Sequence, residues 1–205
     1  NASNPIRTRA IVTTLFLNAV TPLLLIMTTI AEPEMGRSLA IPTSEDVWFA
    51  EALVAAQISM TPLSGFLIAR LGVVSLLRLC ILGISLTGIM SIGVGLLDSL
   101  RSLPLLTGLI FLQGAFVAPL TPATQVLIVT SHPTDERARG MAVWTSARYI
   151  GFLTGSLLAG WIAQSFAWPL IFAVAPLVAV ASLFWLSSDL NAKPAATASV
   201  DWQGF

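Results

Sequence analysis

The chain alternates between long apolar stretches and short polar segments. Apolar residues dominate six stretches, each of roughly 20 residues or more, which is the length that a helix needs to cross a bilayer. The apolar residues within each stretch show no period-2 alternation, which excludes the strands of a membrane barrel. The pattern predicts an all-α integral membrane protein, a bundle of six transmembrane helices at roughly 9–30, 47–68, 73–97, 103–130, 140–162 and 168–187.

Composition supports this prediction. Hydrophobic residues make up 56% of the chain and charged residues only 10%, which is too little charge for a soluble domain of 205 residues. Six tryptophans lie at or near the ends of the apolar stretches. Indole rings collect at the headgroup layer because the ring is apolar and the N–H needs a polar partner. We expect that position for Trp48, Trp144, Trp161, Trp168, Trp185 and Trp202.

Basic residues predict the orientation, because cytoplasmic loops carry an excess of Lys and Arg. With a cytoplasmic amino end, seven basic residues fall in cytoplasmic segments, two in external segments, and Arg148 within a span. Both ends are therefore expected in the cytoplasm. The external loops would be 31–46, 98–102 and 163–167, with Ser44-Glu45-Asp46 as a cap for the helix that follows.

The segments divide the chain into three parts. Residues 1–8 are expected to be a cytoplasmic end and residues 9–187 the six-helix bundle. Small and polar residues then follow, a composition typical of linkers. Residues 188–205 are expected to be a cytoplasmic linker that leads to a possible seventh membrane segment, and Asn1 in place of methionine indicates residues upstream.

Small residues recur every four positions on two predicted helices. One stripe is Gly83, Thr87, Ser91 and Gly95, and the other is Gly151, Gly155 and Ala159. Lipid gives helices no hydrophobic reason to associate, so faces that allow close backbone approach are the usual contact. Both stripes predict helix packing.

Four segments follow one another along nearly the whole chain: GFLIARLG at 65–72, LQG at 112–114, RGMAVWTSARYIGFLTGSLLAGW from Arg139, and the final DWQGF. Together they resemble the amino-terminal half of the major facilitator superfamily, above all its EmrB/QacA-type multidrug exporters. The first resembles that family's 2–3 loop motif, the second its fourth helix, the third its fifth-helix signature with the same spacing from Trp144 to Trp161, and the last the entry to a seventh helix. The helix-packing positions that this resemblance implies are Gly65, Gly72, Gly114, Gly151, Gly155 and Gly160.

The resemblance implies half of a major facilitator fold in a bacterial inner membrane. It also implies efflux of small amphipathic substrates, with no cofactor. Such carriers bind substrate between two six-helix halves. The lipid bilayer and a second half, a homodimer or other membrane subunits are therefore the expected partners.

Five positions depart from the family pattern by lacking a charge. In the EmrB/QacA type an acid precedes Thr-Thr-Ile in the first helix, and this chain has Met27 at that position. The other four positions that lack a charge are Ala69, Val73, Val74 and Ile110. An intramembrane acid is what allows a carrier to exchange protons for substrate. The loss of this acid predicts that transport by this chain is not proton-coupled.

Polar side chains within apolar spans are candidates for the substrate cavity, because they are costly at membrane depth. Arg148 either takes part in function or extends to the cytoplasmic surface, and Glu51 either takes part or reaches interfacial water. The candidates are Asn18, Thr28, Glu51, Gln57, Gln113 and Arg148.

Other kinds of site have no support in the sequence. The chain shows no phosphate-binding loop, nucleophile elbow or HExxH element, so no catalytic residue is expected. His132 is the only histidine and is expected to be solvated in a loop, and Cys80 to be a small core residue, so no metal site is expected. No basic run suggests nucleic acid.

Two functions remain open. The first is a transporter half. The alternative is a degenerate transporter that serves as a structural subunit of a larger membrane complex, since charges are lost while packing glycines and tryptophans persist.

Overall fold

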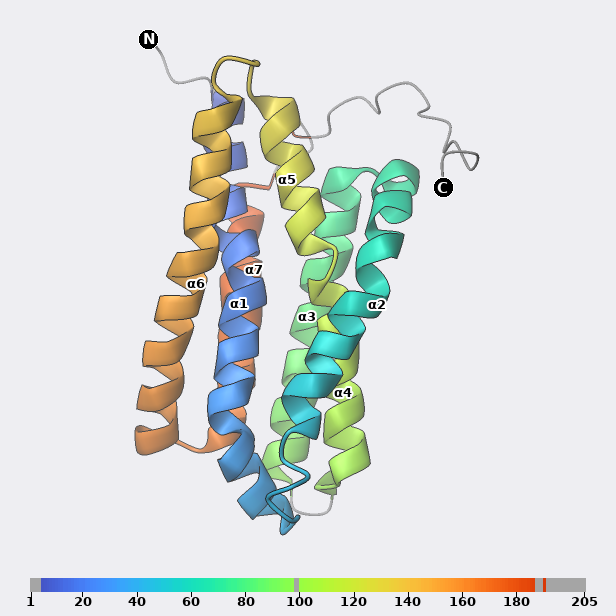
Figure 1. Cartoon of the computed structure of the whole chain (residues 1–205), viewed down its shortest axis with the longest axis vertical. Helices are drawn as coiled ribbons and strands as arrows, with labels where there is room; N and C mark the ends of the chain where they lie inside the picture. The colour runs from blue at the N-terminus through green and yellow to red at the C-terminus, as the bar shows by residue number, and fades with distance from the viewer. Residues whose placement is uncertain (1–4, 98–99, 187–189, 191–205) are drawn as a thin grey trace.

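The computed structural model describes residues 5–97, 100–186 and 190, and these are helical apart from short connections. Seven α-helices run along the long axis of the molecule (Figure 1). They are α1 (Pro5–Leu39), α2 (Trp48–Leu71), α3 (Val73–Leu96), α4 (Leu103–Val117), α5 (Leu120–Ser131), α6 (Arg137–Ser165) and α7 (Ile171–Ala181), with 3-10 turns Trp168–Leu170 and Ser182–Phe184 beside α7.

The helices alternate in direction as six spans, because α4 and α5 follow one another in a single span. The start of α1, the α2–α3 and α5–α6 connections and the end of α7 lie at the upper end of Figure 1. The α1–α2 and α6–α7 connections lie at the lower end. Both described ends of the chain are thus on the same side of the bundle, as an even number of spans requires.

Four helices of the described chain are long and apolar enough to cross a membrane. They are Arg7–Leu39, Trp48–Leu71, Val73–Leu96 and the combined Leu103–Ser131. The other two expected spans meet these criteria less well: α6 has 29 residues but is more polar, and Trp168–Phe184 is a shorter apolar helix. The all-α membrane architecture is confirmed.

The first helix is longer than the sequence indicated. α1 continues to Leu39, so the prediction of a loop is wrong for residues 31–39, and residues 40–47 connect α1 to α2. The extra turns contain good helix formers, and Glu34 and Arg37 form an ion pair of 2.9 Å across one turn. The helix ends where Ala40 adopts a positive φ of 53°.

The cap of α2 also differs from the prediction. No side chain of Ser44, Glu45 or Asp46 caps this helix. The carboxylate of Glu32, on α1, instead accepts a hydrogen bond of 2.8 Å from the backbone N–H of Ala50. An acidic side chain favours the positive amino end of a helix, and here it also links α1 to α2.

Two connections follow directly from residue type. Gly72 alone separates α2 from α3, and its φ of 79° is a conformation that residues with a Cβ rarely adopt. The fourth span is broken between Val117 and Leu120, because Pro119 has no N–H to continue the helix.

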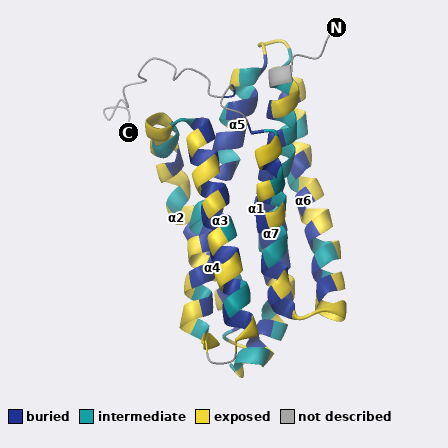
Figure 2. Ribbon diagram, turned by 180° about the vertical axis from the view of Figure 1, so that it is seen from behind, coloured by how far each residue is buried: buried dark blue, intermediate teal, exposed yellow. Residues whose placement is uncertain are grey.

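α1 lies at the centre of one half of the bundle and packs most extensively on α6, with α5 and α7 as further neighbours. The other half pairs α2 with α4, and α3 with α4 and α7. Figure 2 shows buried residues concentrated on the facing sides of the helices and exposed ones on the outer sides. The outward apolar side chains, such as Phe66, Leu82 and Leu157, are exposed by 60%, 67% and 75%.

Small residues allow this packing on both predicted stripes. A Cβ at Gly83 would overlap the Phe116 ring, and one at Gly95 would lie 2.9 Å from the Trp168 indole. On α6, a Cβ at Gly151 would overlap the Ala19 carbonyl, and one at Gly155 would lie 3.1 Å from the Cα of Leu23.

The tryptophans are less uniform than expected. Trp48 and Trp161 are exposed, by 57% and 58%, as headgroup-level indoles would be. Trp168 is instead buried, with 6% exposed, and Trp185 stacks on Phe16 with ring centroids 5.4 Å apart. Trp202 lies outside the described residues.

Candidate functional site

A pocket opens beside α6 on the α1 side of the bundle. Its volume is about 540 Å³, within the range of pockets that hold small molecules. Arg148 is the only lining residue that is charged at neutral pH. The pocket is lined by Pro22 of α1 and by Trp144, Thr145, Arg148, Tyr149 and Phe152 of α6.

The spacing of residues on α6 explains why these side chains meet. Trp144, Arg148 and Phe152 follow at intervals of four, so they lie one above another on one helix face. The small residues Gly151 and Gly155 lie on the adjacent face, against α1. Close approach of the two backbones brings Pro22 to the edge of the pocket.

Hydrogen bonds from two other helices hold the pocket residues in place. The Trp144 indole N–H donates to the hydroxyl of Thr124, at 3.2 Å, and Arg148 donates to the hydroxyl of Thr121, at 3.3 Å. Both threonines belong to α5. From α1, the Asn18 amide donates to the Trp144 carbonyl at 2.6 Å. The aromatic and the cationic wall are thus positioned by neighbours before any ligand binds.

The structure brings only two of the six candidates to this site. Arg148 lines the pocket, and the fully buried Asn18 contacts Trp144 behind it with its carboxamide oxygen unpaired. Thr28 is fully buried with no partner for its hydroxyl, Gln57 is half-buried, and Glu51 is exposed.

Gln113 faces away from the pocket, toward α3. Its side chain is fully buried, and neither its amide nitrogen nor its oxygen has a hydrogen-bond partner. A Cβ on Gly88 of α3 would lie 3.4 Å from that nitrogen and 2.7 Å from the carbonyl oxygen of Phe172. Pro176 has no N–H to offer this carbonyl. Gln113 therefore belongs to the contact of α3, α4 and α7.

The predicted packing glycines differ in what surrounds them. Gly151 and Gly155 lie against α1, and a Cβ on Gly114 would lie 2.6 Å from the Leu53 carbonyl oxygen of α2. Among the described residues, nothing lies within 4 Å of a Cβ built on Gly65 or Gly160. The structure therefore shows no close helix contact at those two positions.

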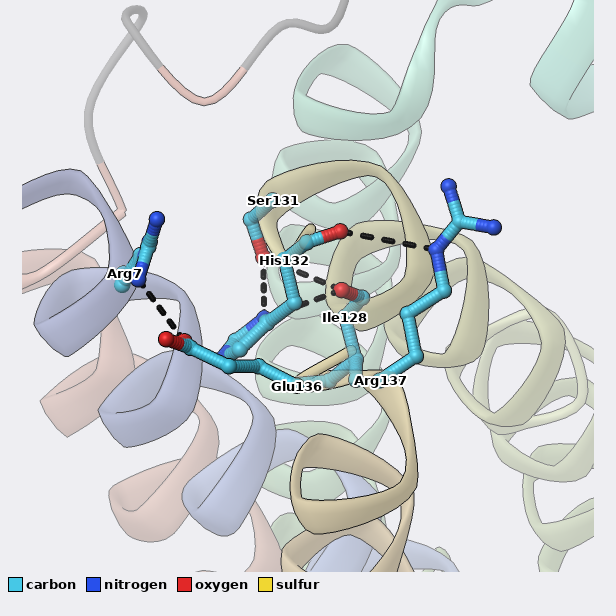
Figure 3. A network of polar contacts seen from close by, with 6 residues as sticks. All are labelled: Arg7, Ile128, Ser131, His132, Glu136 and Arg137. Atoms are coloured by element: carbon cyan, nitrogen blue, oxygen red, sulfur yellow. Dashed lines mark hydrogen bonds and ion pairs between the residues drawn. The ribbon is translucent and has the colours of Figure 1, made fainter. Parts of the chain in front are cut away.

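At the upper end of the bundle, α1 is tied to the α5–α6 connection (Figure 3). Arg7 and Glu136 form an ion pair of 2.7 Å. The prediction of a solvated His132 is wrong, because this side chain is only 7% exposed. Its Nδ1 lies 3.0 Å from both the Ile128 carbonyl oxygen and the Ser131 hydroxyl.

The positions where the EmrB/QacA pattern has charges are mostly core positions here. Met27 and Ile110 are fully buried, and Val73 and Val74 are exposed by 7% and 1%, whereas Ala69 is on the surface. Apolar side chains fill these sites without the cost that an unpaired buried charge would have.

Comparison with known proteins decides the family. The model of the Major Facilitator Superfamily matches residues 12–202. The chain belongs to the major facilitator superfamily. It is similar to an EmrB-like amino-terminal half of that superfamily, as its motifs indicated.

Curated relatives include a fatty acid resistance protein and a multidrug export protein, both at low identity. The chain is 27% identical to the fatty acid resistance protein FarB of Neisseria gonorrhoeae, over 82% of this chain and 32% of that protein. It is 29% identical to the multidrug export protein EmrB of Haemophilus influenzae, over 70% of this chain and 27% of that protein. The chain thus spans about a third of the length of these relatives.

Solved structures of the superfamily share the fold. The proton:xylose symporter XylE aligns with a TM-score of 0.71 at 16% identity, over 89% of this chain and 43% of that one. A bacterial homolog of the human lysosomal transporter Spinster, inward-facing and unoccupied, also aligns with a TM-score of 0.71 at 16% identity. The alignment covers 100% of this chain and 48% of that one. At this identity the likeness concerns the fold alone.

Sequence reasoning missed most of the pocket. Pro22, Thr145, Tyr149 and Phe152 line it, and Trp144 had been expected at the headgroup layer. The available signal was the interval of four between Trp144, Arg148 and Phe152, which places two aromatic rings on either side of a cation on one helix face.

Proposed function

We propose that this chain forms one six-helix half of a membrane carrier for small amphipathic compounds, and that the pocket beside α6 is part of its substrate cavity. The observation that carries the proposal is the pocket itself, which combines three aromatic side chains with a single guanidinium. Family membership supports it, as do the names of two relatives, the fatty acid resistance protein FarB and the multidrug export protein EmrB.

The carrier needs a second half, supplied by a further part of the same protein, by a second copy, or by another subunit. Substrate sites in this class of transporter lie at the interface of two repeats. The proposed location is a bacterial inner membrane, with both described ends in the cytoplasm. Basic residues support this orientation, because Arg7, Arg70 and Arg137 lie toward the end of the bundle that would be cytoplasmic.

Transport is proposed to be independent of a proton gradient. Met27 replaces the acid of the EmrB/QacA pattern and is fully buried among apolar side chains. A membrane-embedded acid is the usual carrier of the coupled proton.

The full gene product reconstituted in vesicles gives the direct test. Efflux of an amphipathic fluorescent dye is expected, with a raised KM for Phe152→Ala, which removes one aromatic wall of the pocket. Leu157→Ala is the matched control, because Leu157 lies on the same helix, is 75% exposed and does not line the pocket. An equal rise in KM in both variants, or no transport by the wild type, would contradict the proposal.

The second candidate is a structural subunit. Its specific support is that apolar residues fill the core at Met27, Val74 and Ile110, so that packing is kept where charge is absent. Purification from native membranes in mild detergent separates the two functions. Constant stoichiometry with other subunits, together with no transport, would favour the structural subunit.

A further inference from the structure

The geometry points to a pocket that selects amphiphiles with one anionic head group, bound by Arg148, while the apolar part contacts Pro22, Trp144 and Phe152. This inference rests on the proposed function and names the substrate class of the same site.

The guanidinium of Arg148 has few partners within the described protein. It forms no ion pair with another described residue, and it donates a hydrogen bond to the neutral hydroxyl of Thr121. A guanidinium carries five N–H donors in a planar fork that matches a carboxylate or a phosphate. Most of this donor capacity is therefore open to an anion.

The described acidic residues are remote from Arg148. The nearest along the chain are Asp135 and Glu136, and Glu136 lies twelve residues before Arg148, about 18 Å away along the helix axis. Glu136 is already paired with Arg7. The acids at 32, 34, 45, 46 and 51 belong to the opposite end of the bundle. A cation held at membrane depth with no acidic partner among the described residues is costly, and an anionic ligand would relieve that cost.

The surroundings of Arg148 are mainly apolar. Trp144 and Phe152 lie one turn to either side of Arg148, with Tyr149 beside it, and Pro22 completes the apolar edge. This arrangement has one charged point and a continuous apolar wall. It matches a molecule with one charged head and an apolar body better than a sugar, whose hydroxyls would need several polar partners.

Two of the pocket side chains are held in place by other helices. Trp144 is fixed through its indole by Thr124 and through its backbone by Asn18, and Arg148 is oriented by Thr121. Side chains held in this way lose little conformational freedom when a ligand binds, which favours affinity.

Binding of matched probes to the full-length protein tests the inference. Dodecanoate, dodecanol and dodecylammonium share a chain length and differ in head-group charge. In phosphatidylcholine nanodiscs the wild type should bind dodecanoate at least about tenfold more tightly than dodecanol, as expected for a hydrogen-bonded charge. Equal affinity for these two probes, or preference for dodecylammonium, would overturn the inference.

Variants assign the selectivity to one side chain. Arg148→Gln should remove the preference for dodecanoate and leave dodecanol binding unchanged, which also shows that the variant is folded. Arg148→Lys should keep part of the preference, because it keeps the charge but not the fork. Arg139→Gln is the matched control, an exposed arginine on the same helix outside the pocket. Loss of preference in Arg139→Gln, or its persistence in Arg148→Gln, would contradict the assignment.

Lipid composition distinguishes the two sources of such an anion. Dodecanoate binding that is the same in phosphatidylcholine and phosphatidylglycerol nanodiscs would support a free amphiphile. Binding abolished by phosphatidylglycerol would identify a lipid head group at Arg148 and overturn the substrate assignment.

Measurements of binding and of transport distinguish a failure of this inference from a failure of the proposed function. Transport without anion preference would overturn this inference alone. Anion binding without transport would overturn the proposed carrier and keep the anion site.

Discussion

Gly151 lies directly against the main chain of Ala19, so that a Cβ on the glycine would overlap the alanine carbonyl. Four residues further along both helices, Gly155 lies against Leu23 in the same way. The interval is the same on both sides of the contact, so α1 and α6 run parallel and in register. Their backbones approach closely over this stretch, which is the arrangement that small residues at intervals of four allow.

Replacement of Gly151 by leucine should separate α1 from α6. We expect a loss of about 1–3 kcal/mol in stability, the usual cost of overpacking a close contact. Thermal unfolding in detergent measures it. Gly160→Leu on the same helix is the control, because nothing in the described chain lies within 4 Å of a Cβ there. Equal stability of Gly151→Leu and the wild type would show that this face does not pack on α1 in the membrane.

Labelling of single cysteines tests the orientation. In a Cys80→Ser background, a cysteine at Asp135, in the α5–α6 connection, should react only with reagent on the cytoplasmic side. One at Thr43, in the α1–α2 connection, should react only from outside. Both residues are exposed. Labelling of Asp135→Cys from outside alone would reverse the proposed orientation.

The helical spans could be predicted because each depends on many residues. Hydropathy sums over some 20 positions, so errors at single positions cancel. Hydropathy does not report the missing N–H of Pro119, so the break within the expected span 103–130 was not predicted. The end of α1 differs from the prediction because its last nine residues are more polar and contain Pro33, which the described helix nevertheless includes.

The site could be predicted less well, because it depends on which way each helix face turns. Gln113 and Arg148 are both polar residues in apolar spans, yet one faces α3 and the other a pocket. A helix turns by about 100° per residue, so the partner of each face follows only from packing. The expected headgroup position of Trp144 fails for the same reason. Its indole N–H bonds to Thr124 of another helix, and that contact depends on how the two helices pack.

Glu32 should stabilise the first turn of α2. Glu32→Ala removes the acceptor of the Ala50 N–H, and a loss of about 1 kcal/mol is expected, as for other helix caps. Amide hydrogen exchange at residues 48–51 should become faster. Glu32→Gln is the control, because it keeps an acceptor oxygen without the charge. Its stability and exchange rates should lie between those of the wild type and Glu32→Ala. Unchanged exchange in Glu32→Ala would argue against the cap.

Gln113→Leu should leave stability unchanged or raise it. The amide is fully buried with no partner for either polar atom, so an apolar side chain of similar volume removes a desolvation cost. Thermal unfolding and dye efflux are the measurements, and efflux should not change because Gln113 does not line the pocket. A clear loss of stability would indicate an internal water between Gln113 and the Phe172 carbonyl.

Met27→Asp should destabilise the bundle without creating proton coupling. The Met27 side chain is fully buried in the core, and an uncompensated buried charge costs about 3–5 kcal/mol. Met27→Leu, which keeps an apolar side chain of similar volume, should cost less than about 1.5 kcal/mol. Proton flux into reconstituted vesicles should be absent from the wild type. Robust substrate-linked proton flux by the wild type would mean that another acid carries the proton.

The pairing of Arg7 with Glu136 has a consequence for biogenesis. The two residues are 129 positions apart. The main packing partner of α1 is α6, which is the fifth span to be made. At about 5–20 residues per second, a ribosome needs on the order of 10 s to extend the chain from one residue to the other. During that interval the newly inserted α1 has its buried Asn18 and its contact face for Gly151 without their partners. These polar and close-packing surfaces of α1 therefore stay uncovered by the rest of the chain until α6 has been made.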